Sequence, residues 1–168
     1  MFTWALVLAP VVSPRGQSPA PKPHAPAGRL HWQKYVNFQH GFSFWYPDVY
    51  KPVPLPPLKG EVSNYAGDSV LLLRRWDNPH ATIWVGVSPD PFHLYPGAGD
   101  LMPTRQMVRH HVFYSGVGGS MGVGFTDFYD LNLKGKTLMF VFGPDDGVNP
   151  NEETKQLEPK LLKTFRTF

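Results

Sequence analysis

The stretch that most constrains the fold is WQKYVNFQHGFSFWYPDVY, residues 32–50. Residues 42–46 alternate with a period of two, so three aromatic rings share one face of a strand and Trp45 lies on the other. An earlier extended run covers residues 34–38, and the connection between the two runs ends in Gly41, the residue most free to adopt positive φ. The pattern therefore predicts an aromatic β-hairpin, which indicates a fold and no reaction.

The composition favours strands and loops over a helical bundle. The chain has 168 residues, with 19 prolines, 16 glycines and 42% hydrophobic residues. Roughly 140 residues follow the N-terminal region, which is the usual size of one domain. We expect residues 29–168 to form a single α+β domain.

The N-terminal region has the composition of an export signal followed by a spacer. Residues 2–12, FTWALVLAPVV, match the length of a signal-peptide apolar region and are too short to cross a bilayer as a helix. No basic residue precedes them, so the basic part of the signal is missing or the true start lies upstream. We expect residues 1–12 to be a signal segment and residues 13–28 a proline-rich linker. This predicts a periplasmic or secreted location.

Four more strands are predicted in the middle of the chain. Residues 69–76 and 81–88 form a second hairpin, and residues 125–133 pair with 137–142 through a turn at Lys134-Gly135. In 137–142 both faces are apolar, which is typical of a central strand covered on each side.

The remaining segments of the middle are assigned as follows. A strand starts at residues 111–115 and is interrupted by the glycine-rich residues 116–124. The proline-rich residues 51–60 and 89–103 are expected to be loops, and residues 104–109 a short helix.

The C-terminal segment predicts a capped helix that covers the sheet. Asn149 as N-cap, Pro150 in the first turn and Glu152 form a capping pattern. An apolar stripe follows, made of Leu157, Leu161, Leu162 and Phe165. Pro159 is expected to kink this helix or start a second one, and residues 165–168 to return as a short strand.

Two stretches resemble a known superfamily. They are the aromatic hairpin with the strand before it, Trp32–Pro47, and the run LEPKLLKTFRTF, Leu157–Phe168. Together they resemble the PsbP-like superfamily, which includes the extrinsic PsbP protein of photosystem II, a Ran-binding nuclear import factor and many small exported bacterial proteins. The resemblance implies an antiparallel β-sheet flanked by helices, an α/β/α sandwich. The export-like start makes the chain most similar to the bacterial members, and no family active-site residues carry over.

Composition excludes several classes of site. The sequence has no cysteine, which removes disulfides, thiolate metal sites, cysteine nucleophiles and a lipobox anchor. The net charge is +3, but the basic residues are scattered instead of forming a stripe. We therefore expect no nucleic-acid partner.

One motif suggests a hydrolase. Residues 118–122, GGSMG, satisfy the G-x-S-x-G pattern in which a strand-to-helix turn presents a serine nucleophile, here Ser120. The residues that follow read as strand and turn, and no histidine occurs after His111 to serve as the base in the order that this hydrolase class uses. A flexible glycine loop or a bulge explains the motif more simply.

The sequence predicts no metal site and no cofactor site. Its seven histidines form no H-E-x-x-H motif, and His110 and His111 are expected to point to opposite faces of a strand. Residues 145–149, DDGVN, lack the spacing of a calcium loop and are better read as a turn before the helix.

Two tryptophans are the candidate ligand-binding residues. Trp45 and Trp84 both point away from the dominant apolar face of their strands. Exposed, they would form a stacking surface for a glycan or another small ligand; buried, they would belong to a second core layer.

The leading hypothesis is an exported, non-catalytic accessory or binding domain of the cell envelope, with an envelope protein or glycan as partner. Two alternatives remain: a carbohydrate or small-ligand binding module that uses Trp45 and Trp84, and a serine hydrolase centred on Ser120. The first hypothesis includes no integral membrane span.

Overall fold

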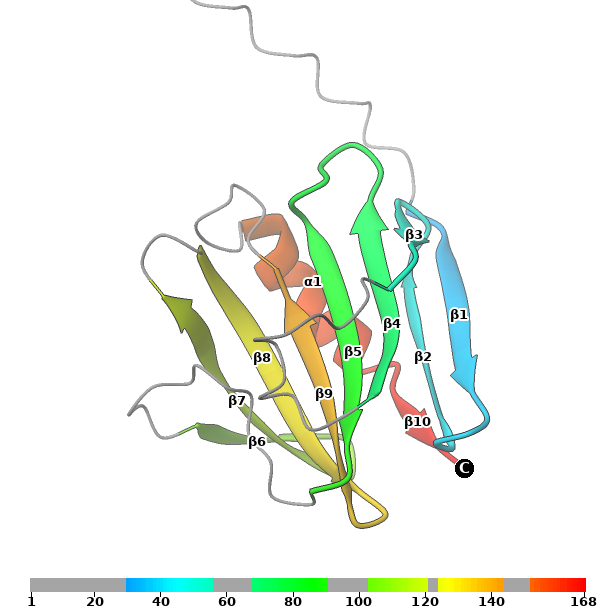
Figure 1. Cartoon of the computed structure of the whole chain (residues 1–168), viewed down its shortest axis with the longest axis vertical. Coiled ribbons are helices and arrows are strands. Elements are labelled where there is room, and N and C mark those ends of the chain that lie inside the picture. Colours follow the sequence, from blue (N-terminus) through cyan, green and yellow to red (C-terminus); the bar gives the residue numbers. More distant parts are fainter. Residues whose placement is uncertain (1–29, 56–67, 91–102, 121–123, 144–151) are drawn as a thin grey trace, which may run out of the picture.

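The computed structural model describes residues 30–55, 68–90, 103–120, 124–143 and 152–168, which form two antiparallel sheets and one helix (Figure 1). The large sheet has the strand order β3-β4-β5-β9-β8-β7-β6. Its strands are β3 (Tyr50–Pro52), β4 (Asp68–Arg75), β5 (Thr82–Ser88), β6 (Thr104–Val108), β7 (His111–Ser120), β8 (Gly124–Leu133) and β9 (Lys136–Phe142).

The small sheet has the order β1-β2-β10, with β1 (Trp32–Asn37), β2 (Phe42–Pro47) and β10 (Arg166–Thr167). The helix α1 (Glu152–Leu162) precedes β10. Within the part of the chain described, no helix has the length and apolar character needed to cross a membrane.

The structure confirms the predicted hairpins and their turns. β1 pairs with β2, β4 with β5, and β8 with β9, all antiparallel. Gly41 has a φ of 70°, and Lys134 and Gly135 have φ values of 53° and 78°. Positive φ at both central residues is the signature of a two-residue type I′ turn, whose twist matches that of the flanking strands.

β9 is the central strand, as its two apolar faces predicted. It lies between β5 and β8 in the large sheet, and six of its seven residues are buried. Phe140 faces the small sheet and the helix, whereas Val141 faces the opposite side of the large sheet.

The small sheet and α1 pack together on one face of the large sheet through aromatic rings. The ring of Phe44 in β2 lies 5.2 Å from that of Phe140 in β9. Phe165, between α1 and β10, is fully buried and has ring centroids within 6.1 Å of Phe42, Phe113 and Phe140. Phe165 therefore joins β2 of the small sheet to β7 and β9 of the large sheet.

The predicted apolar stripe of the helix is confirmed. Leu157, Leu161 and Leu162 are buried, at spacings that place them on one face of α1. The helix runs through Pro159 as a single element, so no second helix starts there. The predicted cap residues Asn149 and Pro150 lie outside the described residues.

The predicted α/β/α arrangement needs correction. The described fold is β-rich, with one helix, and that helix shares its face of the large sheet with a second sheet. The aromatic face of the β1–β2 hairpin takes the place of a helix as cover, because the buried rings of Phe42 and Phe44 pack against Phe165 and Phe140.

Three local predictions were wrong. The first concerns residues 104–109, which form strand β6 and a turn, because pairing with β7 outweighs a weak helical pattern. Residues 116–120 continue β7 instead of interrupting it: a Cβ on Gly116 would lie 2.9 Å from the Phe128 ring, so this glycine accommodates a neighbouring ring. The segment 51–60 begins with part of edge strand β3. Most of the predicted loop at 89–103 lies outside the described residues.

Replacement of Phe165 by alanine tests its role in joining the layers. We expect the free energy of unfolding to fall by about 3–5 kcal/mol, since a fully buried aromatic ring would be replaced by a cavity. Urea denaturation followed by circular dichroism measures this. Phe168→Ala is the matched control, because Phe168 is 55% exposed and its loss should change stability by about 1 kcal/mol or less. Equal losses for the two variants would contradict the assignment.

Candidate functional site

The two candidate tryptophans do not form a common site. Trp45 follows Phe44 in β2 and points away from the core, with 42% of its surface exposed. Trp84 pairs in register with Val141 and so lies on the face of the large sheet that is opposite to Phe140. Both sheets therefore separate the two indoles, and a stacking platform that uses both is not present.

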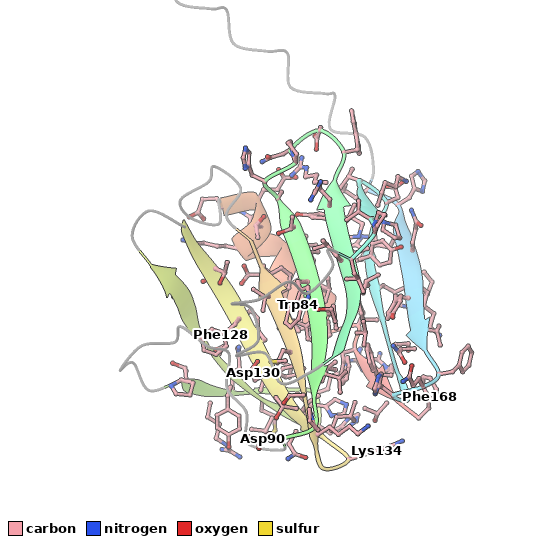
Figure 2. The ribbon with its side chains drawn as sticks, in the orientation of Figure 1. Trp84, Asp90, Phe128, Asp130, Lys134 and Phe168 are labelled. Atoms are coloured by element: carbon pink, nitrogen blue, oxygen red, sulfur yellow. The ribbon has the colours of Figure 1, made fainter. Side chains whose placement is uncertain are left out.

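Trp84 packs flat on its own strand. Its ring lies over Gly86, where a Cβ would come 2.1 Å from Cη2, and its Nε1 donates a hydrogen bond of 3.0 Å to Ser69 Oγ. Phe128 lies on the same face of the sheet (Figure 2) and is fully buried. Trp84 thus belongs to a second cluster of side chains on the large sheet.

The contact of Trp84 with Gly86 makes a double-mutant prediction. Gly86→Ala alone should destabilise the protein by about 1–3 kcal/mol, because the new methyl group must displace the indole. In a Trp84→Ala background the same change should cost less than about 0.5 kcal/mol. Urea denaturation of the four proteins gives the coupling between the two positions. Equal costs in both backgrounds would show that the ring does not occupy this place.

The strand-to-helix turn required for a nucleophile at Ser120 is not formed. β7 continues to Ser120, whose Cα is paired with that of Gly124 at the start of β8. Ser120 is therefore the last residue of strand β7, and the next element among the described residues is strand β8, where the nucleophile motif requires a helix.

The prediction that His110 and His111 point to opposite faces was wrong. Their ring centroids lie 4.1 Å apart, because His110 belongs to the turn between β6 and β7 and the alternation of a strand does not apply to it. His111 also packs edge-on against Phe165. Among the described residues, no group of three or more histidine or acidic side chains could hold a metal ion. Residues 145–149 lie outside this part of the chain.

The structure reveals a buried acidic cluster that the sequence analysis missed. Tyr129 of β8 donates a hydrogen bond of 2.6 Å to Glu158 of α1, and Asp127, two residues before Tyr129, also hydrogen-bonds to Glu158. Glu158 is only 3% exposed. The signal that could have revealed it is its position on the helix, since Glu158 shares a face with Thr154, Leu157, Leu161 and Leu162.

Burial determines the protonation of this cluster. It raises the pKa of Glu158 to about 8; the hydrogen bond from Tyr129 opposes this rise and the nearby Asp127 reinforces it. Burial also raises the pKa of Asp127, and of Tyr129. Glu158 Oε1 is buried and accepts no hydrogen bond. A protonated Glu158 beside Asp127 accounts for the raised pKa of Glu158 and is uncharged at neutral pH.

The raised pKa of Glu158 should make the stability of the protein depend on pH, and Glu158→Gln should reduce this dependence. Because its pKa is higher in the folded protein than the ordinary 4.5, Glu158 stabilises the fold fully below about pH 4.5, and this contribution is lost as the pH rises through 8. Wild-type stability should therefore decline between pH 5 and pH 8, and the decline should be smaller in Glu158→Gln by on the order of 1 kcal/mol or more.

The measurement is urea denaturation at several pH values. Glu152→Gln is the control, since Glu152 is exposed in the first turn of α1 and should keep the wild-type slope. His111 acts in the opposite direction, because burial, His110 and Arg166 lower its pKa, and it is unchanged in both variants. An unaltered slope in Glu158→Gln would contradict the assigned proton.

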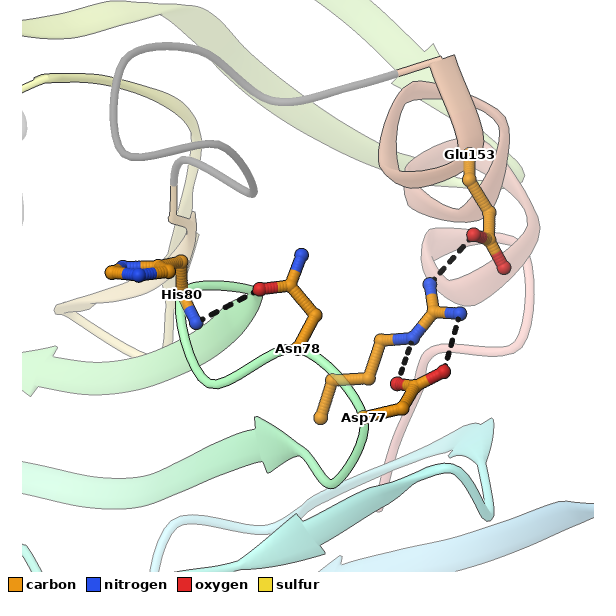
Figure 3. A network of polar contacts seen from close by, with 5 residues as sticks. Asp77, Asn78, His80 and Glu153 are labelled. Carbon is orange, nitrogen blue, oxygen red and sulfur yellow. Dashed lines mark hydrogen bonds and ion pairs between the residues drawn. The ribbon is translucent and has the colours of Figure 1, made fainter. Parts of the chain in front are cut away.

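A second polar network holds the start of α1 against the β4–β5 turn (Figure 3). Arg75 donates from Nε to Asp77 Oδ1 at 2.7 Å, and its Nη1 lies 2.6 Å from Glu153 Oε2. Burial alone would lower the pKa of Arg75, but the bonds to Asp77 and Glu153 raise it above its ordinary value. Every group in this network is paired, which is typical of a structural contact.

Comparison with known proteins identifies the fold. No protein-family model and no curated protein matches the sequence. Among solved structures, the solution structure of cyanobacterial PsbP (CyanoP) from Synechocystis sp. PCC 6803 is similar to this chain. The TM-score is 0.57 and the sequence identity 14%, over 87% of this chain and 98% of the other. The chain therefore has a PsbP-like fold, as its aromatic hairpin and C-terminal run indicated.

Proposed function

We propose that this chain is a non-catalytic accessory domain that is exported to the cell envelope and binds a partner protein there. The observation that carries this proposal is an exposed pair of phenylalanines. Phe38 and Phe168 are 84% and 55% exposed, and their ring centroids lie 5.9 Å apart. Large apolar rings gathered on a surface are unfavourable in water and commonly mark a contact with a partner.

Neighbouring residues hold this pair in place. The backbone N–H of Phe168 donates to Gly41 O at 3.1 Å, and Lys134 Nζ donates to Phe168 O at 2.7 Å. Lys134 and Phe168 lie at the same end of the molecule (Figure 2). The rings border a hollow of about 230 Å³ that Val87 and Leu138 also line. A positioned apolar surface of this kind loses little conformational freedom on binding.

The chemistry of the described residues supports a binding role over catalysis. Glu158, whose pKa is strongly raised, is only 3% exposed between β8 and α1, and Ser120 is the last residue of strand β7. The signal-like residues 1–12 and the proline-rich residues 13–28 support export. The exposed Lys134 and Lys136 beside the rings favour an acidic rim on the partner.

The experiment locates the protein and captures its partner from the envelope. We expect the tagged full chain to be found in the envelope fraction of its native cells and to co-purify with a partner after mild cross-linking. Phe38→Ser should reduce the recovery of that partner at least tenfold, the effect expected of a central apolar contact.

Trp76→Ser is the matched control, because Trp76 is 66% exposed but does not line this hollow, and its loss should leave recovery unchanged. Cytoplasmic location would overturn export, and equal recovery with Phe38→Ser would overturn the role of the aromatic pair.

A further inference from the structure

We propose that the open edge of β6, together with the groove between β6 and α1, binds an extended acidic peptide segment by adding it to the large sheet as a strand. This inference rests on the proposed partner-binding role and names a second surface and the kind of segment that it accepts. β6 is the last strand in the order of the large sheet and pairs only with β7 among the described residues.

The short turn that connects β6 to β7 determines which backbone groups point to the open edge. Val108 pairs with His111 across the two-residue turn Arg109-His110. Val108 and His111 are therefore the hydrogen-bonded pair that closes the hairpin. Bonding alternates along an antiparallel strand, so Gln106 and Thr104 also bond to β7. The N–H and C=O groups of Arg105 and Met107 are therefore directed outward, where an added strand would meet them.

A groove runs beside this edge. It has a volume of about 450 Å³, and its apolar walls come from Val108 of β6, from Pro159 and Leu162 of α1, and from the ring of Tyr129. An edge strand beside a helix is the arrangement in which a peptide gains main-chain hydrogen bonds from the strand while alternate side chains enter the groove.

The charge of the groove favours an acidic occupant. Arg109 and Lys163 line one end, and the lining includes no acidic side chain. Arg109 has a φ of 59°, which is unfavourable for a residue with a Cβ, and its Nε donates to Lys163 O at 2.6 Å. The contact holds its guanidinium against the end of α1, and its Nη groups have no acceptor among the described residues. A carboxylate of the peptide would bind there.

Selection from a random peptide library tests this proposal. The probe is a phage-displayed library of about twelve-residue peptides, selected on the immobilised full chain, with binding of the selected peptides measured by fluorescence anisotropy. We expect the selected peptides to alternate apolar and acidic residues, and Met107→Pro to weaken their binding at least tenfold. Proline at 107 removes an outward N–H and no bond to β7, so the fold should be retained.

Met107→Ala is the matched control, since it removes the same side chain and keeps the N–H; it should weaken binding less than threefold. Lys163→Glu should weaken binding at least tenfold. Lys160→Glu, in the last turn of α1 and outside the groove, should not. If Met107→Pro fails to fold, N-methylation of alternate peptide amides removes the same strand pairing from the other side.

No enrichment of peptides, or equal binding to Met107→Pro and Met107→Ala, would overturn the proposal. Recovery of the envelope partner by the same variants tests this inference separately from the proposed function. If Met107→Pro and Lys163→Glu both retain that partner while Phe38→Ser loses it, the β6 groove is not its binding site and the accessory role still stands.

Discussion

Burial of aromatic rings between the two sheets is the interaction on which the rest of the fold depends. The β1–β2 hairpin has few partners of its own, and a two-stranded ribbon is marginally stable in water. Phe42 and Phe44 give it a hydrophobic face, and Phe165 lies where that face, the helix and the large sheet meet. Because the buried Phe165 ring lies between α1 and β10, it holds the end of the helix and the start of the strand in place. The position of Glu158 and of the groove beside β6 follows from the same placement of the helix.

Much of this fold could be predicted from the sequence, because strands with one buried face have a clear period. The hairpins, the central strand β9 and the helical stripe all follow from where apolar residues recur. The missed features depend on neighbours that sequence does not show. β6 is a strand because β7 is beside it, and Gly116 is suited to its place in β7 because the Phe128 ring leaves no room for a Cβ there. Glu158 was overlooked because a single acidic residue in an apolar stripe looks solvated until a tyrosine is placed against it.

The predicted ligand site at Trp45 and Trp84 also depended on neighbours that the sequence does not show. Period-two alternation correctly indicated that Trp45 and Trp84 point away from the main apolar faces of their strands, but it does not tell which layer each strand belongs to. Trp45 is in the small sheet and Trp84 in the large sheet. Two side chains that both point away from the core therefore lie on opposite sides of the molecule. Features that need only local geometry, such as the turn at Lys134-Gly135, could be predicted, whereas a site assembled from β6, β8 and α1 could not.

The pairing of β10 with β2 has a consequence for the order in which the protein can fold. Thr164 accepts the backbone N–H of Trp45 across 119 residues of sequence, and β10 follows at once. A chain synthesised in N-to-C order exposes the aromatic face of the β1–β2 hairpin long before Phe165 is present to cover it. Contacts of such separation form late. The growing chain therefore leaves this row of phenylalanines uncovered until Phe165 has been synthesised, so the two layers can close only after most of the chain is present.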